Sequence, residues 1–506
     1  MRVLFVNFNL NSTPGINNGL AILSSVLKKK NHEVRLLFLC NELGYDLDFA
    51  RIKKDVLDSR PDIIGISLME TQLKHMKAFL KNLRKYYKGL VVCGGPHPTM
   101  NPEDVLSIKG IDVVCVGEGE GAILEFIEAL KAGRDYKDIK NLWFNSDNGK
   151  IIKNRLRFFT SLETLPPEDK ELFDLDKLLP LKNYQLEVML GRGCMYQCTY
   201  CINKPFIEQY RQLCENEITA KDYMRVKKSC TVIEEIKNSV LRHPEIKKIA
   251  FIDDDFLMYT NFANDFFEKY KKEINLPFMC NINPVSFNVS KGHLLKEAGC
   301  DDIRFGVESG SERVKNDIMK RPIRNRSIIS AFNITKKLGL MTSSFNMIGL
   351  PTETKEEILE TLKLNAAIGP DSMKVMTFYP FKNTPLYDVC REMDLIDEEK
   401  KMELDNYDTF TCLRFPAEHQ LFLRKVQSVF NWYINAFLEN EASGEYSKMI
   451  RDVEKMTESR WDKFDHLSCD KELSEKMRRK NAPHYSKFVN RSLAVKYPSK
   501  HCEKKR

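Results

Sequence analysis

The sequence of 506 residues has no stretch of about 18 consecutive apolar residues, so it predicts no membrane span. Its first residues, MRVLFVNFN, lack a basic leader and a small-residue cleavage site, and a buried strand is expected there instead of a signal peptide. Hydrophobic residues make up 42% and charged residues 30% of the chain. This composition predicts a cytoplasmic globular protein of about two to four domains.

The chain also lacks a second C-x2-C pair, which a zinc ribbon would need as its other half. Fourteen cysteines are present, and without a secretory leader they are not expected to form a disulfide framework. Most are scattered through apolar strand contexts, as Cys40, Cys93 and Cys115 are, and we interpret these as small core residues. Such a content of thiols favours an anoxic cytoplasm.

No strong excess of one charge is present, because the net charge is only +8, and a mild value of this kind does not predict nucleic-acid binding. The excess is concentrated between Lys476 and Arg506, where Glu503 is the only acid among many lysine and arginine residues. We interpret this segment as a solvated tail. Contact with an anionic substrate, a partner or a membrane surface is the alternative.

Residues 1–145 alternate apolar runs with helical patterns. The runs are continuous and rich in β-branched residues, which is typical of strands buried on both faces. They lie at 3–6, 34–39, 63–68, 90–93, 112–116 and 142–144. This pattern predicts an α/β fold with a doubly wound, Rossmann-like parallel sheet, followed by a proline-containing linker over residues 146–185.

The alternation of strands and helices restarts at residue 186 and continues to 390. Its apolar runs lie at 186–190, 249–252, 278–283, 303–307, 343–349 and 373–379. Six units are fewer than the eight of a closed barrel, so we expect a partial (β/α)6 barrel. Residues 391–506 are predicted to form a mostly helical region that ends in the basic tail, because Leu423, Val426 and Phe430 follow helical spacing.

The segment GRGCMYQCTYC (191–201) carries the clearest chemical signal. Cys194, Cys198 and Cys201 provide soft thiolates at spacings of four and three, which are able to converge on one iron–sulfur cluster. Four-iron clusters usually take four cysteines, so three leave one iron open to an external ligand. Gly191 and Gly193 would let the loop fold tightly around the cluster. Three ordinary buried cysteines are the alternative interpretation.

This motif resembles that of the radical S-adenosylmethionine (SAM) superfamily, in which C-x3-C-x-aromatic-C holds a [4Fe-4S] cluster; Tyr200 stands at the aromatic position. The resemblance implies that the open iron binds SAM. It also implies that one electron, from a donor such as ferredoxin or flavodoxin, cleaves SAM to methionine and a 5′-deoxyadenosyl radical. The radical then takes a hydrogen atom from an unactivated carbon.

The later strand ends resemble the same superfamily in order and residue type. FIDDDF resembles its acidic motif for the methionine ammonium, FGVESG its pair for ribose and carboxylate, and FNMIGLPTET its segment along the adenine. Taken singly, an aspartate run is often a helix cap and Gly-x-Pro is often a turn. The residues to which the resemblance gives contacts with SAM are Tyr200, Asp253, Asp254, Glu308, Ser309, Arg321 and Gly349.

The strand ends of the N-terminal half are rich in glycine, which permits close backbone approach to a large ligand. A nucleotide-binding site would need G-x-G-x-x-G after the first strand, where this chain has NFNLNSTPG. CGGPHPTMNPED and VGEGEG instead resemble the cobalamin-binding domain that precedes many radical SAM domains. The implied cobalamin contacts are Asn7, Ser67, Met69, Glu70, Gly94, Gly95, His97, Pro98, Gly117, Glu118 and Gly119.

One motif of other cobalamin proteins is missing. The D-x-H-x-x-G sequence, whose histidine ligates cobalt from below, does not occur. His97 lies in a proline-flanked loop, where we favour a structural or ring-edge role over ligation. The lower face of cobalt is therefore not expected to be held by a histidine.

The resemblance covers about residues 1–390 and implies a cobalamin-dependent radical SAM enzyme that methylates an unactivated carbon or a phosphinate phosphorus. A cyclase or rearranging enzyme without methyl transfer and a non-catalytic cobalamin sensor are alternatives. A methylthiotransferase is disfavoured, because three further cluster cysteines and a C-terminal RNA-binding barrel would be expected. No motif identifies the substrate or a catalytic residue.

Overall fold

The computed structural model describes residues 1–146, 149–488 and 493–498, so part of the basic tail lies outside the described residues. Its N-terminal domain is built on a seven-stranded sheet in the order β2-β1-β3-β4-β5-β6-β7. The strands are β1 (Arg2–Phe8), β2 (Glu33–Leu39), β3 (Ile63–Ser67), β4 (Leu90–Gly94), β5 (Val113–Cys115), β6 (Leu142–Asn145) and β7 (Ile151–Lys153). The first five are parallel, and β6 and β7 are antiparallel.

Helices cover both faces of this sheet because alternate side chains of each strand point to opposite sides. Val3 and Phe5 of β1 belong to the core that includes α1 and α6, whereas Leu4 and Val6 belong to the core that includes α2, α3 and α5. The helices are α1 (Asn18–Lys28), α2 (Phe49–Ser59), α3 (Leu73–Leu83), α4 (Pro96–Met100), α5 (Pro102–Leu106) and α6 (Glu120–Lys131). The doubly wound sheet expected from the sequence is confirmed.

The second domain is a curved eight-stranded sheet in the order β16-β17-β15-β14-β13-β12-β11-β8. Its six parallel strands are β8 (Gln185–Val188), β11 (Lys248–Phe251), β12 (Phe278–Ile282), β13 (Cys300–Glu308), β14 (Met341–Ile348) and β15 (Ser372–Thr377). The helices between them are α10 (Ser229–Arg242), α11 (Thr260–Glu273), α12 (Val289–Glu297), α13 (Asn325–Lys337) and α14 (Lys355–Ile368). The predicted partial barrel of six units is therefore confirmed.

The C-terminal region is mostly helical, as predicted, but it also adds two short strands to the barrel. β17 (Ala494–Tyr497) pairs antiparallel with β15 and with β16 (His484–Ser486). Segments of three or four residues are too short to show the alternation that identifies a strand in a sequence. The helices are α15 (Pro385–Glu392), α16 (Glu398–Glu403), α17 (Ala417–Phe437), α18 (Ser443–Glu454), α19 (Glu458–Trp461) and α20 (His466–Arg479).

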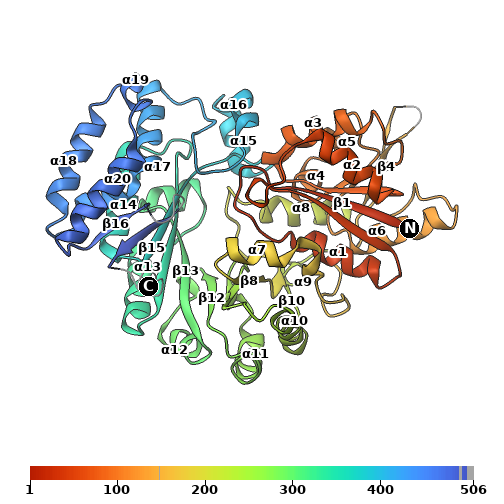
Figure 1. Cartoon of the computed structure of the whole chain (residues 1–506), viewed down its shortest axis with the longest axis horizontal. Coiled ribbons are helices and arrows are strands. Elements are labelled where there is room, and N and C mark those ends of the chain that lie inside the picture. The colour runs from red at the N-terminus through yellow and green to blue at the C-terminus, as the bar shows by residue number, and fades with distance from the viewer. Residues whose placement is uncertain (147–148, 489–492, 499–506) are drawn as a thin grey trace.

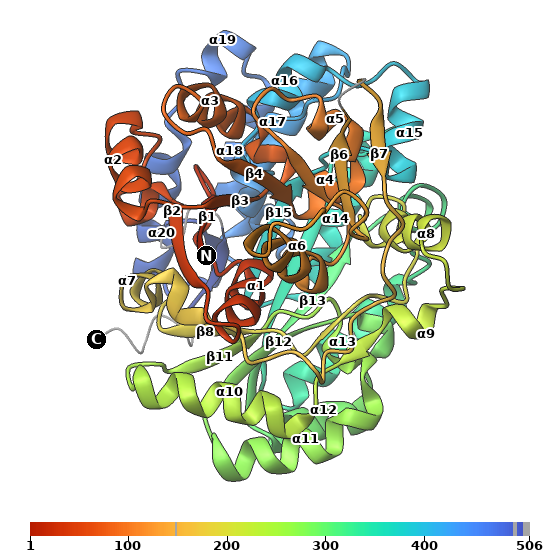
Figure 2. The same ribbon diagram turned by 90° about the vertical axis from the view of Figure 1, so that its right-hand side faces the viewer.

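The N-terminal sheet and the open barrel lie side by side, and the C-terminal helices stand at the opposite edge of the barrel (Figures 1 and 2). The linker is fastened to the barrel by buried charges, because Lys170 and Lys227 both contact Glu168 and Lys227 also contacts Glu235. In the part of the chain that the structure describes, no helix is both long and apolar enough to cross a membrane.

Candidate active site

The three cysteines lie in the loop between β9 (Gly191–Arg192) and α8 (Asn203–Leu213). β9 pairs antiparallel with β10 (Arg225–Val226), which brings the loop against the segment after α9 (Ala220–Tyr223). Gly193 has φ +96°, and a side chain there would collide with the carbonyl group of Tyr223. The glycines that flank Arg192 are therefore required by the packing of the loop and not only by its flexibility.

The cysteine thiols are shielded from water, as a site for a metal cluster requires. Burial raises the pKa of Cys194 to about 12 and that of Cys201 to about 11, and Asn203 Nδ2 lies 3.5 Å from the Cys201 sulfur. Cys198 is buried. Soft thiolates in a dry pocket suit iron, which replaces the thiol protons on binding, so the donor set fits a [4Fe-4S] cluster.

The two aspartates of the expected SAM motif play different parts in the structure. Asp253 is buried and accepts hydrogen bonds from the backbone N–H groups of Leu190 (3.0 Å) and Gly191 (2.9 Å), so it fixes the start of the cysteine loop. Asp254 accepts a hydrogen bond of 2.8 Å from Asn203 Nδ2 and lines a cavity of about 240 Å³ beside the loop. Asp253 lines the same cavity, but its carboxylate is engaged by the loop backbone, whereas Asp254 is bonded, among the described residues, only to the Asn203 side chain.

Glu308 and Arg321 meet beside the cluster loop. Glu308 ends β13 with φ +63°, an uncommon conformation for a residue with a side chain and one that often marks a functional site. Arg321 Nη2 lies 3.9 Å from Glu308 and donates to the Gly306 carbonyl at 3.0 Å, but its buried Nε has no hydrogen-bond partner among the described residues. Burial first, and then the charge of Glu308, raise the pKa of Tyr200 well above its usual value. The unpartnered guanidinium nitrogen fits a carboxylate such as that of SAM.

Ser309 and Gly349 shape turns in this structure. The Ser309 hydroxyl accepts from the Ser311 N–H at 3.2 Å and lies 3.3 Å from Thr361 Oγ1. Gly349 has φ +78° and donates its N–H to Glu353 at 2.7 Å. Both residues therefore lie at the predicted strand ends, with their polar groups already engaged by the protein.

A cavity of about 360 Å³ opens at the carboxyl ends of the N-terminal strands. From the expected cobalamin set it is lined by Ser67, Gly94, Gly95, Gly117, Glu118 and Gly119, and from the barrel by Met189, Arg192, Ile202, Asn203, Phe206 and Tyr223. Its wall also holds Glu120, whose Oε2 is buried without a partner among the described residues. An apolar cavity with such an acceptor fits a corrin ring, whose edge carries amide donors.

The remaining expected contacts lie beside this cavity. Met69, Glu70 and His97 line a small adjacent hollow with Phe381 and Lys382. Glu70 accepts hydrogen bonds from the Lys382 N–H (3.2 Å) and from Lys401 Nζ (2.7 Å), so it anchors the two domains to each other.

His97 is buried within hydrogen-bond distance of Asn101, and burial lowers its pKa. Asn7 accepts a hydrogen bond of 3.1 Å from Asn17, which also donates to Ser67 at 3.0 Å. Pro98 is buried in α4.

A buried ion-pair network, which the sequence analysis missed, joins the two cavities. Glu118 lies 2.9 Å from Arg192 and 2.7 Å from Arg225, and Arg192 also pairs with Glu120 at 2.6 Å. The two arginines come from the cluster loop and the strand that pairs with it, whereas both glutamates come from the N-terminal domain. Arg192 lines both cavities, which therefore meet at this residue. The one sequence feature that could have indicated this network is the position of Arg192, two residues before Cys194.

Substitution of Gly95 with alanine is expected to destabilise the wall of the larger cavity. Gly95 has φ +103°, and an added Cβ would lie 2.9 Å from the Leu68 nitrogen. The strain and the clash together predict a loss of about 2 kcal/mol of unfolding free energy, with reduced cobalamin retention, measured by urea denaturation and by absorbance. Gly133→Ala is the matched control, because Gly133 has φ +63° with open space around it. If both variants lost the same unfolding free energy and the same cobalamin retention, Gly95 would have no special role in the wall of the cavity.

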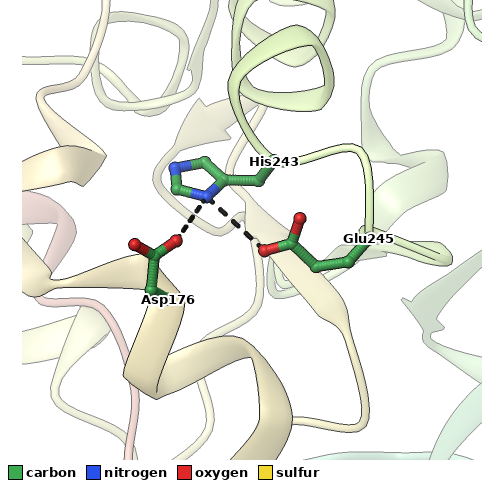
Figure 3. A group of neighbouring side chains, drawn as sticks. All are labelled: Asp176, His243 and Glu245. Atoms are coloured by element: carbon green, nitrogen blue, oxygen red, sulfur yellow. Dashed lines mark ion pairs between the residues drawn. The ribbon is translucent and has the colours of Figure 1, made fainter.

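A second group of ligand-type side chains lies between the linker and α10. His243 Nδ1 is 3.1 Å from Asp176 and 3.6 Å from Glu245 (Figure 3). Its Nε2 is 3.0 Å from Glu171. Among the described residues this is the group whose ligand atoms lie close enough for a single metal ion. The ion pairs account for the arrangement without a metal.

His243 is expected to stabilise the fold most strongly at acidic pH. Burial alone would lower its pKa, but the hydrogen bond that its ring donates to Glu171 and the charges of Glu171, Asp176 and Glu245 outweigh burial and raise the pKa above 6.5. The contribution is therefore complete below about pH 6.5 and is lost as the pH rises through the folded-state pKa. His243→Gln should cost about 1 kcal/mol at pH 6 and less at pH 9 in urea denaturation. A cost that grows with pH would contradict this.

Comparisons with known proteins agree with the two-cofactor geometry. Residues 12–127 match the B12 binding domain family, and residues 188–364 match the Radical SAM superfamily. An uncharacterized methyltransferase of Pyrococcus horikoshii is 29% identical over 396 residues, which cover 76% of this chain and 80% of that protein. The anaerobic magnesium-protoporphyrin IX monomethyl ester cyclase of Rubrivivax gelatinosus is 21% identical over 445 residues, covering 82% and 74%.

The fold is also similar to a solved structure. The radical SAM methyltransferase TsrM of Kitasatospora setae aligns with a TM-score of 0.62 at 16% identity, over 77% of this chain and 76% of that chain. The B12 binding match includes most of the cavity lined by Ser67 and Gly95, and the Radical SAM match includes all three cysteines of the cluster loop. The chain thus carries a B12 binding domain followed by a Radical SAM domain, the domains of a radical SAM enzyme that uses cobalamin, a [4Fe-4S] cluster and SAM.

Proposed function

We propose that this enzyme cleaves SAM reductively and methylates an unactivated carbon of its substrate. The observation that carries the proposal is the meeting of the two cavities at Arg192 and Glu118, because it sets the two cofactor sites against each other. When bound, the cofactors supply a 5′-deoxyadenosyl radical from one SAM and a transferable methyl group from another. An electron donor such as ferredoxin or flavodoxin would provide the reducing electron.

The chain's own residues would bind and orient these groups. Cys194, Cys198 and Cys201 would hold the cluster, Asp254 would face the ammonium group of SAM, and Arg321 its carboxylate. The larger cavity would hold the corrin between the glycine-rich strand ends and Phe206 and Tyr223 of the barrel. Burial of this whole region would keep water and oxygen away from the radical.

Product analysis under anaerobic conditions tests the proposal. The reconstituted enzyme with SAM, cobalamin, a reductant and substrate should form 5′-deoxyadenosine and S-adenosylhomocysteine together. Formation of 5′-deoxyadenosine without S-adenosylhomocysteine would contradict methyl transfer. That result would favour a cyclase or rearranging enzyme, the second candidate, which the similarity to the Rubrivivax gelatinosus cyclase supports.

A further inference from the structure

The inner face of the barrel carries partly exposed side chains on three neighbouring strands. On β13 the outward side chains Ile303, Phe305 and Val307 are fully buried, whereas Arg304 and Glu308, on the other face, are partly exposed. The inward side chains of β14 and β15 are partly exposed in the same alternating way: Phe345, Met347, Lys374 and Met376. Because strand side chains alternate between faces, these partly exposed residues share the inner face of the sheet with Glu308.

Most charges on this inner face have partners of opposite sign. Glu187 of β8 pairs with Lys182 at 2.6 Å. Lys374 of β15 pairs with Asp408 at 2.9 Å, and that aspartate comes from the C-terminal region. Near the cofactor edge, Glu308 faces Arg321. In each of these pairs the two opposite charges largely cancel, so none of the paired residues offers a free charge to a ligand.

Arg304 is different. Among the described residues, no carboxylate lies within ion-pair distance of its guanidinium, and the guanidinium donates no hydrogen bond to any of them. The group sits 6.0 Å from the centre of the Phe345 ring. Its neighbours in register on the adjacent strands are Asn281 and Ser343, which are uncharged. Asp302, two residues earlier on the same face, accepts a hydrogen bond of 3.4 Å from Ser343 Oγ and forms no ion pair with Arg304. A half-buried guanidinium without a counter-ion lacks the pairing that such groups normally find in proteins.

We propose that Arg304 binds an anionic group of the substrate, a carboxylate or a phosphate, inside the barrel. A guanidinium presents a planar fork that matches two oxygens of either group, and the ring of Phe345 supports its face. Arg304 precedes Glu308 by four residues on the same strand face, which places it about 13 Å deeper in the barrel. An anchored substrate would thus extend from Arg304 towards the cofactors. This inference rests on the proposed function and specifies its substrate class.

Arginine labelling tests the binding site without knowledge of the substrate. The reconstituted enzyme is treated with phenylglyoxal, and labelling of Arg304 is followed by mass spectrometry in inorganic phosphate, in acetate and in chloride of equal ionic strength. Phosphate or acetate should slow labelling of Arg304 about tenfold relative to chloride. Protection by phosphate alone identifies a phosphate site, and protection by acetate identifies a carboxylate site. No protection, or no labelling in chloride, would overturn the proposal.

Exposed Arg134 serves as the reference in the same digest, because its labelling should not depend on the anion. Equal slowing at Arg134 would show a general anion effect and would also overturn the proposal.

The charge of the natural substrate provides the second test. Extract of the source organism is separated by anion exchange, and each fraction is incubated with the reconstituted enzyme and SAM and then analysed for methylated product. Product should arise only from retained fractions, and Arg304→Met should lower kcat/KM about ten- to a hundredfold, with partial recovery in Arg304→Lys. Product from unretained fractions, or an unchanged Arg304→Met variant, would contradict the inference. If the reconstituted wild-type enzyme formed no 5′-deoxyadenosine with any fraction, that result would instead count against the proposed function.

Discussion

Cys198→Ala is expected to lower SAM cleavage at least about a thousandfold, because a cluster with two protein ligands has lost the site-differentiated iron to which SAM would bind. Cys198 is buried at the centre of the loop, and its backbone carbonyl accepts from the Cys201 N–H at 3.2 Å. Iron and sulfide content and anaerobic formation of 5′-deoxyadenosine measure the effect.

The matched control for that variant is Cys230→Ala. Cys230 is exposed on α10, outside the cluster loop, and its substitution should leave iron content and SAM cleavage unchanged. Should Cys198→Ala retain both the iron and the cleavage activity, the cluster assignment would be wrong. Loss in both variants would indicate a general failure of reconstitution and would call for the same test at Cys194.

Glu118→Gln is expected to cost about 3–5 kcal/mol of unfolding free energy, because it leaves the mostly buried Arg225 guanidinium without its anion and leaves Arg192 with Glu120 alone. Glu118 accepts hydrogen bonds from Arg192, Arg225 and the backbone N–H of Thr160. A neutral amide satisfies the geometry of these contacts only in part and supplies no charge. Urea denaturation of the apoprotein measures the loss, and cobalamin retention should fall with it.

An exposed ion pair provides the comparison for Glu118. Glu125 pairs with Arg157, and their side chains are 49% and 33% exposed, so Glu125→Gln should cost less than about 1 kcal/mol. A double-mutant cycle between Glu118→Gln and Arg192→Met would then isolate their coupling. A coupling energy near zero would be evidence against a structural link between the two cavities.

The elements that depend on local pattern could be predicted from the sequence. Continuous apolar runs identified the buried parallel strands, because a strand covered on both faces has no polar side to interrupt it. The spacing of Cys194, Cys198 and Cys201 predicted a cluster loop, since all three cysteines lie within one short segment. The glycines at 94, 95, 117 and 119 identified the wall of the larger cavity for the same reason.

Contacts between segments far apart in the chain could not be predicted. Glu70, which stays a predicted cobalamin contact, also pairs with Lys401, more than three hundred residues later. Asp253, which stays a predicted SAM contact, also accepts hydrogen bonds from the backbone of the cysteine loop. In both cases the residue lies at the anticipated strand end. Its partner depends on which other segment packs there, and no local pattern records that choice.

The sequence by itself therefore determined the two α/β domains, their order and the three cysteines, because each follows from periodicity or from spacing within a short segment. Only the tertiary structure decided that Arg192 and Arg225 meet Glu118 between the cavities, that β16 and β17 extend the barrel sheet, and that Arg304 lies on its inner face without an ion-pair partner among the described residues. The physical reason is that burial and charge pairing are properties of assembled surfaces, which residues distant in the chain create together.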